Sequence, residues 1–188
     1  MNSQALALGS IKDVANKTNK SISEIFCNVK MAVFLDISSS MDYEDCCGGE
    51  SRISVATRHL TNLQNENHGG IALICWNSKA EFVPNGIPTS PSGTTVLMSA
   101  LDYAKTFDGC TIKIVVISDG EPSDVEESIS MAKTFKSKIH TIYVGPENGK
   151  GHSVLKRLSE ISGGTFTVNN IANLHIDLGK SMTKLLTD

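Results

Sequence analysis

The chain has 188 residues, the length of one domain of ordinary size, so a single fold is expected. Its 17 basic and 20 acidic residues give a formal net charge of −3, which provides no general positive field for a phosphate backbone and argues against duplex nucleic acid as a partner. No run of about 18 apolar residues occurs, so the sequence predicts no membrane span.

The first 29 residues precede the first buried strand, and we expect them to form a helical extension of one or two helices packed on the domain of residues 30–188. Ser21-x-x-Glu24 is a capping box, which is typical of a helix start. No basic segment stands before an apolar one at the N-terminus, so no export signal is evident. Five cysteines without a C-x-x-C pair favour a reducing compartment. These features favour a cytoplasmic protein.

Buried strands are predicted from continuous apolar runs that end in polar residues. Four such runs occupy residues 31–37, 71–76, 112–117 and 139–144. Residues 80–83 follow the second run closely enough to return as a short antiparallel edge strand, and residues 165–168 after Gly163-Gly164 are a plausible final strand.

Segments with helical periodicity lie between these strands, at residues 52–63, 95–107, 123–135, 154–162 and 171–186. Ser123-x-x-Glu126 is a second capping-box pattern. Alternation of strand and helix implies parallel strands joined by right-handed crossovers. The predicted fold class is therefore α/β, with a doubly wound, mostly parallel sheet, one short antiparallel edge strand and helices on both faces.

Three polar segments fall where this fold places ligand sites, at the carboxyl ends of strands near the point where strand order reverses. The first strand ends in Asp36-Ile37-Ser38-Ser39-Ser40, the strand of residues 112–117 is followed by Ser118-Asp119-Gly120, and Thr94-Thr95 precedes a helix. Carboxylate and hydroxyl oxygens without nearby Cys or His suit Mg²⁺ or Mn²⁺ better than zinc. On an extended segment the side chains of Asp36, Ser38 and Ser40 would point the same way.

Each segment taken alone has a simpler explanation. A serine-rich turn often caps a helix, Asp119-Gly120 is a common strand-end turn, and Thr94-Thr95 is compatible with an ordinary N-cap. Their occurrence together, in this order and at strand ends, favours a metal site.

Residues 31–169 resemble a von Willebrand factor type A (vWA) domain, and the three segments match that family's metal-ion-dependent adhesion site (MIDAS). Asp36, Ser38 and Ser40 meet its Asp-x-Ser-x-Ser signature, and Asp119 its final aspartate. Counting back from Ala100-Leu101 makes Thr95 rather than Thr94 the threonine ligand. The resemblance implies a Rossmann-like vWA fold.

The resemblance also implies a function. In the family, the serines and the threonine bind the cation directly or through water, and the aspartates act directly or through water. Incomplete coordination leaves the ion able to accept an Asp or Glu carboxylate from a protein partner. We therefore expect a non-catalytic, Mg²⁺-dependent (or Mn²⁺-dependent) protein-interaction module that assembles or regulates an intracellular complex.

One segment departs from the better-known adhesive members of the family. Residues 42–50 form an acidic insert directly after the metal loop and include the adjacent cysteines Cys46 and Cys47. Its carboxylates could supply extra oxygens or repel an acidic ligand, but solvated loop charges are the simpler interpretation.

Three alternatives stay open. One is a metal-dependent phosphohydrolase that uses the same pocket, although the haloacid dehalogenase type needs a second acid where Ser38 stands. Another is a ribonucleoprotein-associated vWA domain. The third is a degenerate structural member of the family in which the oxygen set holds no metal. His140 lies in a predicted strand and is expected to be a core imidazole, and Trp76 is expected to pack rather than stack on a base.

Overall fold

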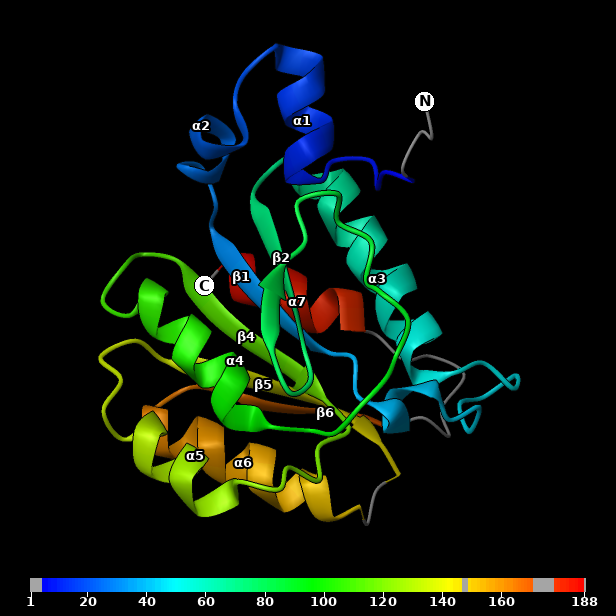
Figure 1. Ribbon diagram of the computed structural model, residues 1–188, viewed down its shortest axis with the longest axis vertical. Helices are drawn as coiled ribbons and strands as arrows, with labels where there is room; N and C mark the ends of the chain where they lie inside the picture. Colours follow the sequence, from blue (N-terminus) through cyan, green and yellow to red (C-terminus); the bar gives the residue numbers. More distant parts are fainter. Residues whose placement is uncertain (1–4, 147–148, 171–177, 188) are drawn as a thin grey trace.

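The computed structural model describes residues 5–146, 149–170 and 178–187, and within them the chain forms a six-stranded sheet in the order β3-β2-β1-β4-β5-β6 (Figure 1). Only β3 runs antiparallel to its neighbour, and every other pair of adjacent strands is parallel. The α/β class and the antiparallel edge strand are therefore confirmed. The strands are β1 (Met31–Asp36), β2 (Ile71–Trp76), β3 (Ala80–Phe82), β4 (Lys113–Ser118), β5 (Ile139–Gly145) and β6 (Phe166–Asn170).

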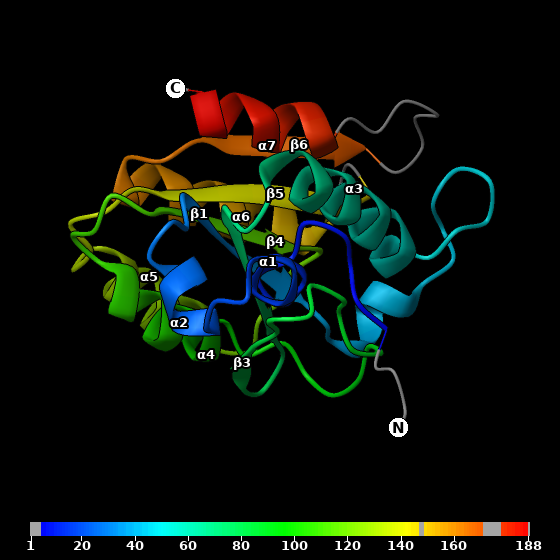
Figure 2. The same ribbon diagram turned by 90° about the horizontal axis from the view of Figure 1, so that it is seen from above.

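Helices cover both faces of this sheet (Figure 2). The helices α3 (Arg52–Asn67) and α7 (Leu178–Thr187) lie on one face, and α4 (Leu97–Ala104), α5 (Val125–Ala132) and α6 (Lys150–Ser162) lie on the other. No described helix is both long and apolar enough to cross a membrane.

The core has two layers because successive side chains of a strand point to opposite faces. In β1, Ala32 and Phe34 join the cluster under α4 to α6, while Val33 and Leu35 join the cluster under α3 and α7. All six residues of β1 are buried, which explains why this strand appears in the sequence as one continuous apolar run. Trp76 is buried in the first cluster, as expected. His140 is only partly buried, and its Nδ1 lies 2.9 Å from Thr165 Oγ1.

Three helix starts differ from the prediction. Helix α4 begins at Leu97, and the predicted capping box of Ser123 and Glu126 is wrong, because α5 begins at Val125 and Glu126 binds Arg157. Helix α6 begins earlier than expected, at Lys150. Part of the predicted helix of residues 171–186 lies outside the described residues, and α7 accounts for the remainder.

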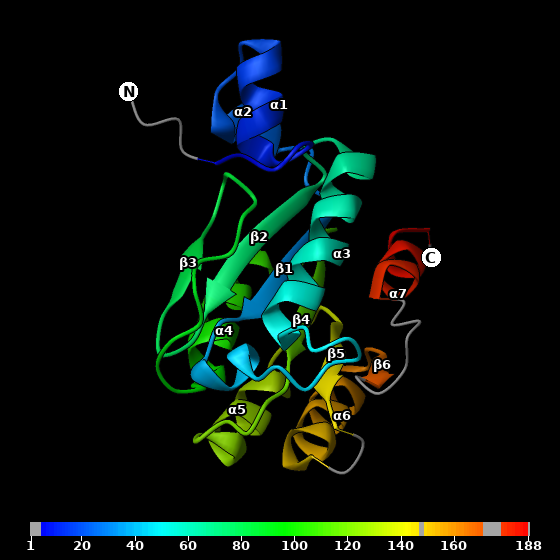
Figure 3. The same ribbon diagram turned by 90° about the vertical axis from the view of Figure 1, so that its right-hand side faces the viewer.

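The predicted N-terminal helices are present as α1 (Ile11–Thr18) and α2 (Ile22–Phe26). The capping box of α2 is confirmed, since Glu24 N donates to Ser21 Oγ and Ser21 N donates to Glu24 Oε2. Ile11 and Ile25 lie in the same buried cluster as the sheet residues. Figure 3 shows both helices at the end of the sheet where β1 and β2 begin.

A close backbone contact fastens this extension to α3. Gly9 has a φ of +74°, and a Cβ atom there would lie 2.0 Å from the carbonyl oxygen of Gln64. The amide of Gly9 donates to Asp13 Oδ2 at 2.8 Å, and Lys17 donates to the same oxygen. Only glycine fits this contact without displacing one of the two segments.

Gly9→Ala should therefore destabilise the protein through two effects, the left-handed backbone and the steric overlap. Gly109→Ala is the matched control, since Gly109 has a φ of +79° but no atom within 4 Å of its added Cβ. We expect Gly9→Ala to lower the free energy of unfolding by about 1–3 kcal/mol more than the control does, measured by urea denaturation. Equal losses would contradict the described contact.

Candidate functional site

The candidate site lies where the strand order reverses. From β1 the chain continues to β2 on one side and later returns to β4 on the other, which opens a crevice at the carboxyl ends of β1 and β4. Asp36 is the last residue of β1, and Asp119 directly follows the last residue of β4. Since Leu35 pairs with Ile117 in the parallel register, Asp36 is level with Ser118, and Asp119 lies one residue beyond it at the same edge of the sheet.

Asp36 lies beneath the site rather than in its wall. The side chain is completely buried, Oδ1 accepts a hydrogen bond from Ser38 N at 2.7 Å, and Oδ2 accepts one from Ser118 Oγ at 2.6 Å. Both carboxylate oxygens are thus held in a fixed orientation. Ser118, which the sequence analysis did not assign, supplies one of these two bonds.

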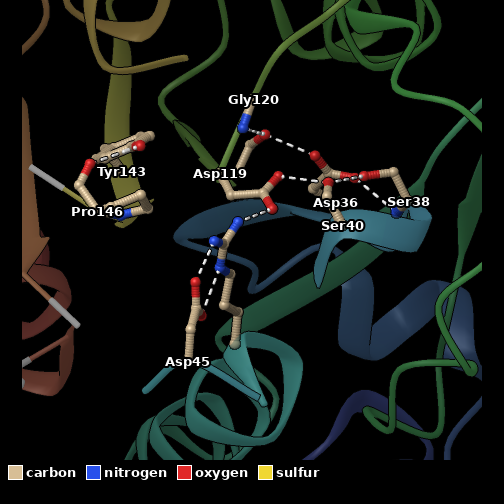
Figure 4. Close-up of polar contacts among 10 residues, drawn as sticks. Asp36, Ser38, Ser40, Asp45, Asp119, Gly120, Tyr143 and Pro146 are labelled. Atoms are coloured by element: carbon tan, nitrogen blue, oxygen red, sulfur yellow. Dashed lines mark hydrogen bonds and ion pairs between the residues drawn. The ribbon is translucent and has the colours of Figure 1, made fainter. Parts of the chain in front are cut away.

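The serine loop brings its hydroxyls together by a different path from the one expected. The chain is extended at Ser38 but then enters a 3₁₀ helix, Ser39–Asp42, so the predicted strand-like alternation does not continue to Ser40. The turn nevertheless places Ser38 Oγ 3.2 Å from Ser40 Oγ (Figure 4). Ser39 also lines the pocket at this site, but its hydroxyl donates to the carbonyl of Gly93.

Asp119 completes this group of oxygens. Its Oδ1 accepts a hydrogen bond from Ser40 Oγ at 3.0 Å, although the two residues are 79 positions apart in sequence (Figure 4). Thr95 lies in the wall of the same pocket, together with Ser38, Ser40 and Asp119. The pocket has a volume of about 420 Å³. Four of the five predicted site residues therefore line one pocket, and Asp36 lies directly under it.

The oxygen set fits a small hard cation in composition and in spacing. In an octahedral Mg²⁺ shell with bonds of about 2.0–2.1 Å, adjacent ligand oxygens lie about 2.9 Å apart. The Ser38–Ser40 and Ser40–Asp119 oxygen distances of 3.2 and 3.0 Å are close to this value. No group of three or more His, Cys, Asp and Glu that could hold a metal occurs among the described residues, so a cation here would depend on the hydroxyls.

Arg52, the first residue of α3, also reaches the site, which the sequence analysis missed. Its Nη1 donates to Asp119 Oδ2 at 2.5 Å, and its Nε and Nη2 donate to the two carboxylate oxygens of Asp45 (Figure 4). The ring of Tyr43 lies 5.3 Å from the guanidinium carbon. Burial opposes the charged form, but the bonds to Asp45 and Asp119 outweigh it and raise the pKa of Arg52. An arginine at a helix start directly after an acidic insert was the available signal.

The acidic insert is organised by arginines of α3. Asp45 pairs with Arg52, and Glu50 pairs with Arg58, while Asp42 and Glu44 are exposed. The charges of the insert are solvated as expected, since Asp45 and Glu50 are each 39% exposed, but these two acids also have cationic partners that the sequence did not indicate. Cys46 is buried against the core, Cys47 is partly buried, and both are free thiols.

The two site aspartates have raised pKa values. The pKa of Asp36 is raised to about 6, chiefly because burial removes water from the carboxylate, while hydrogen bonds from Ser118 and Ser38 lower it. Burial also raises the pKa of Asp119, against the lowering effect of its bonds to Arg52 and Ser40. A divalent cation beside these carboxylates would favour their charged forms and lower both pKa values.

The loop after Asp119 is tied to the loop that carries Thr95. Asp124 accepts hydrogen bonds from the amides of Leu97 and Met98, at 2.9 and 2.6 Å, and so caps helix α4 from another part of the chain. Ser123 N donates to the carbonyl of Thr95 at 3.1 Å. Asp124 is therefore a positioning residue for Thr95.

The raised pKa of Asp36 predicts a pH-dependent difference in stability. The folded protein binds this proton more tightly than the unfolded chain, so the stabilising effect is complete below about pH 3.8 and is lost as the pH rises through about 6. In the variant Asp36→Asn, the amide side chain carries no charge at any pH. In the presence of a chelator, the variant should gain about 2 kcal/mol in the free energy of unfolding relative to wild type between pH 4 and pH 7. Urea unfolding of both proteins tests this, and a difference independent of pH would contradict it.

Asp124→Ala should remove two bonds at the start of α4 and lower the free energy of unfolding by about 1–2 kcal/mol. Because Thr95 lies two residues before that helix, cation affinity should fall as well. Asp102→Ala, an exposed site on the same helix, is the matched control for charge. Thermal unfolding and Mn²⁺ calorimetry measure the two effects, and equal results for the two variants would show that the bonds to Leu97 and Met98 are unimportant.

Comparison with known proteins shows the fold. No protein-family model matches the chain, and no curated protein matches it. Solved structures do match the chain. One is the conserved hypothetical protein BatB from Bacteroides thetaiotaomicron, with 17% sequence identity and a TM-score of 0.60. The match covers 85% of this chain and 100% of the BatB chain. A mutant of the PilB minor pilin from Streptococcus sanguinis has 15% identity and a TM-score of 0.59, over 85% of this chain and 61% of the pilin chain. At these identities the likeness shows the fold alone, a Rossmann-like, vWA-like α/β fold.

Proposed function

We propose that the protein is a non-catalytic interaction module that binds Mg²⁺ or Mn²⁺ at the pocket formed by Ser38, Ser40, Thr95 and Asp119, with Asp36 beneath it. The observation that carries this proposal is the close approach of Ser38 Oγ, Ser40 Oγ and Asp119 Oδ1, which come from two separate strand ends. These oxygens are of the type and spacing that a hard divalent cation requires.

A partner carboxylate is the ligand that this arrangement favours. Because Arg52 is already paired with Asp119, the two site carboxylates would not fully balance the charge of a divalent ion, and hydroxyl ligands add no negative charge. The cation would then retain open positions toward the pocket, and an Asp or Glu side chain would supply both an oxygen and a charge. Tyr43 lines the same pocket and is 61% exposed, so an aromatic surface is available beside that carboxylate for contact with a protein partner.

The placement of Asp36 supports binding rather than phosphoryl transfer. A carboxylate nucleophile must reach its substrate, but Asp36 is fully buried and both its oxygens accept hydrogen bonds. The residue two positions later is Ser38, which cannot act as a carboxylic general acid.

Calorimetric titration with Mn²⁺ tests cation binding. Wild type should bind one ion, and Ser40→Ala and Asp36→Asn should each weaken binding by about tenfold or more, because each removes a ligand or a charge. Asp102→Asn, which removes an exposed charge on α4, should bind as wild type does. Equal heats for wild type and Asp36→Asn would count decisively against the proposed site.

A carboxylate probe tests the second part of the proposal. Acetate should perturb the amide resonances of residues 38–40 in the presence of Mg²⁺ and leave them unchanged in the presence of EDTA. Acetate binding that is the same in both conditions would contradict a cation-mediated contact. Hydrolysis of p-nitrophenyl phosphate that is lost in Asp36→Asn would instead favour a phosphohydrolase.

A further inference from the structure

Asp119 has a resident counter-ion in this protein. Its Oδ2 accepts a hydrogen bond from Arg52 Nη1 at 2.5 Å, while its Oδ1 faces Ser40. The side chains of both members of this ion pair are largely buried, with exposed fractions of 9% for Arg52 and 2% for Asp119. The same carboxylate that the cation would use is therefore already paired with a positive charge.

The charge of Arg52 cannot be removed by deprotonation, because a guanidinium remains protonated at all ordinary pH values. Here its bonds to Asp45 and Asp119 raise its pKa further. A divalent cation beside Asp119 Oδ1 would lie a few ångströms from this guanidinium, and the two positive charges would repel each other in a partly buried site.

Asp45 provides the alternative partner that would let the guanidinium stay nearby. It engages Nε and Nη2 of Arg52, so the arginine keeps two hydrogen bonds even if Nη1 releases Asp119. The side chain of Asp45 is 39% exposed, whereas that of Asp119 is 2% exposed. The exposed acid thus anchors the arginine, and the buried acid is the one that a cation would compete for.

We propose that Arg52 sets the affinity of the cation site by acting as a competitor for Asp119 that a divalent ion must displace. This inference rests on the proposed function, because it assumes that the cation binds at the oxygens of Ser38, Ser40 and Asp119. It assigns Arg52 as an affinity-determining residue and Asp45 as its anchor.

Substitution of Arg52 by uncharged side chains tests the proposal. Arg52→Met removes the charge and the hydrogen bonds, and Arg52→Gln retains an N–H donor without the charge. Each variant should bind Mn²⁺ at least tenfold more tightly than wild type in calorimetry. Thermal unfolding in the presence of EDTA checks that each variant folds, and Arg52→Gln is the alternative if Arg52→Met does not.

Arg58→Met is the matched control. Arg58 lies on the same helix and pairs with Glu50 of the same acidic insert, but that pair is exposed and makes no contact with Asp119. The Mn²⁺ affinity of the Arg58→Met variant should stay within about twofold of wild type, because exposed charges are screened by water and salt. A tenfold gain in Arg58→Met as well would show that only the net charge matters and would overturn the assignment of Arg52.

The outcomes separate this inference from the proposed function. A gain in Mn²⁺ affinity from Arg52→Met that disappears when the same substitution is made in Asp119→Asn supports competition at Asp119. If wild type shows no binding but Arg52→Met does, Arg52 is the competitor and the proposed function fails for the natural chain. If wild type and a folded Arg52 variant bind equally, the inference is wrong while the cation site stands. If neither binds, both are wrong.

Discussion

The site depends on a carboxylate that is buried at the carboxyl end of a central strand. Asp36 has no exposed surface, and its two oxygens are held by Ser38 N and Ser118 Oγ. A buried carboxylate is costly in its charged form, which is why the pKa of Asp36 is raised to about 6. The hydrogen bond from Ser38 N to Asp36 also holds the serine loop in position above this carboxylate. The proposed cation site and the geometry of this loop therefore both depend on one side chain.

The fold was predictable because its buried strands can be recognised from short, continuous stretches of the sequence. β1 and β4 are buried on both faces, so they appear as continuous apolar runs that end at Asp36 and Asp119. The order of the elements then requires the two aspartates to meet at the switch point. The capping of α4 was not predictable in this way, because Asp124 reaches the amides of Leu97 and Met98 from a loop that is distant in sequence.

The sequence predicted the five residues that gather at the candidate site, but not Ser118 and Arg52, which bind its two aspartates. The pattern of Asp36, Ser38 and Ser40 marks the loop, yet the hydroxyls converge through a 3₁₀ turn rather than through strand alternation. Nothing in the spacing indicates that Arg52, 67 positions from Asp119, is the partner of that aspartate. Ion pairs between distant positions follow from packing, and here the packing of α3 against the serine loop brings the arginine to the site.

The most direct test of the account is the position of a bound ion. In a crystal of the protein grown with Mn²⁺, anomalous scattering should show one peak within bonding distance of Ser38 Oγ and Ser40 Oγ, with Thr95 and Asp119 in the surrounding shell. An ordered serine loop without such a peak at saturating Mn²⁺, or a peak only at the exposed carboxylates of the acidic insert, would contradict the account.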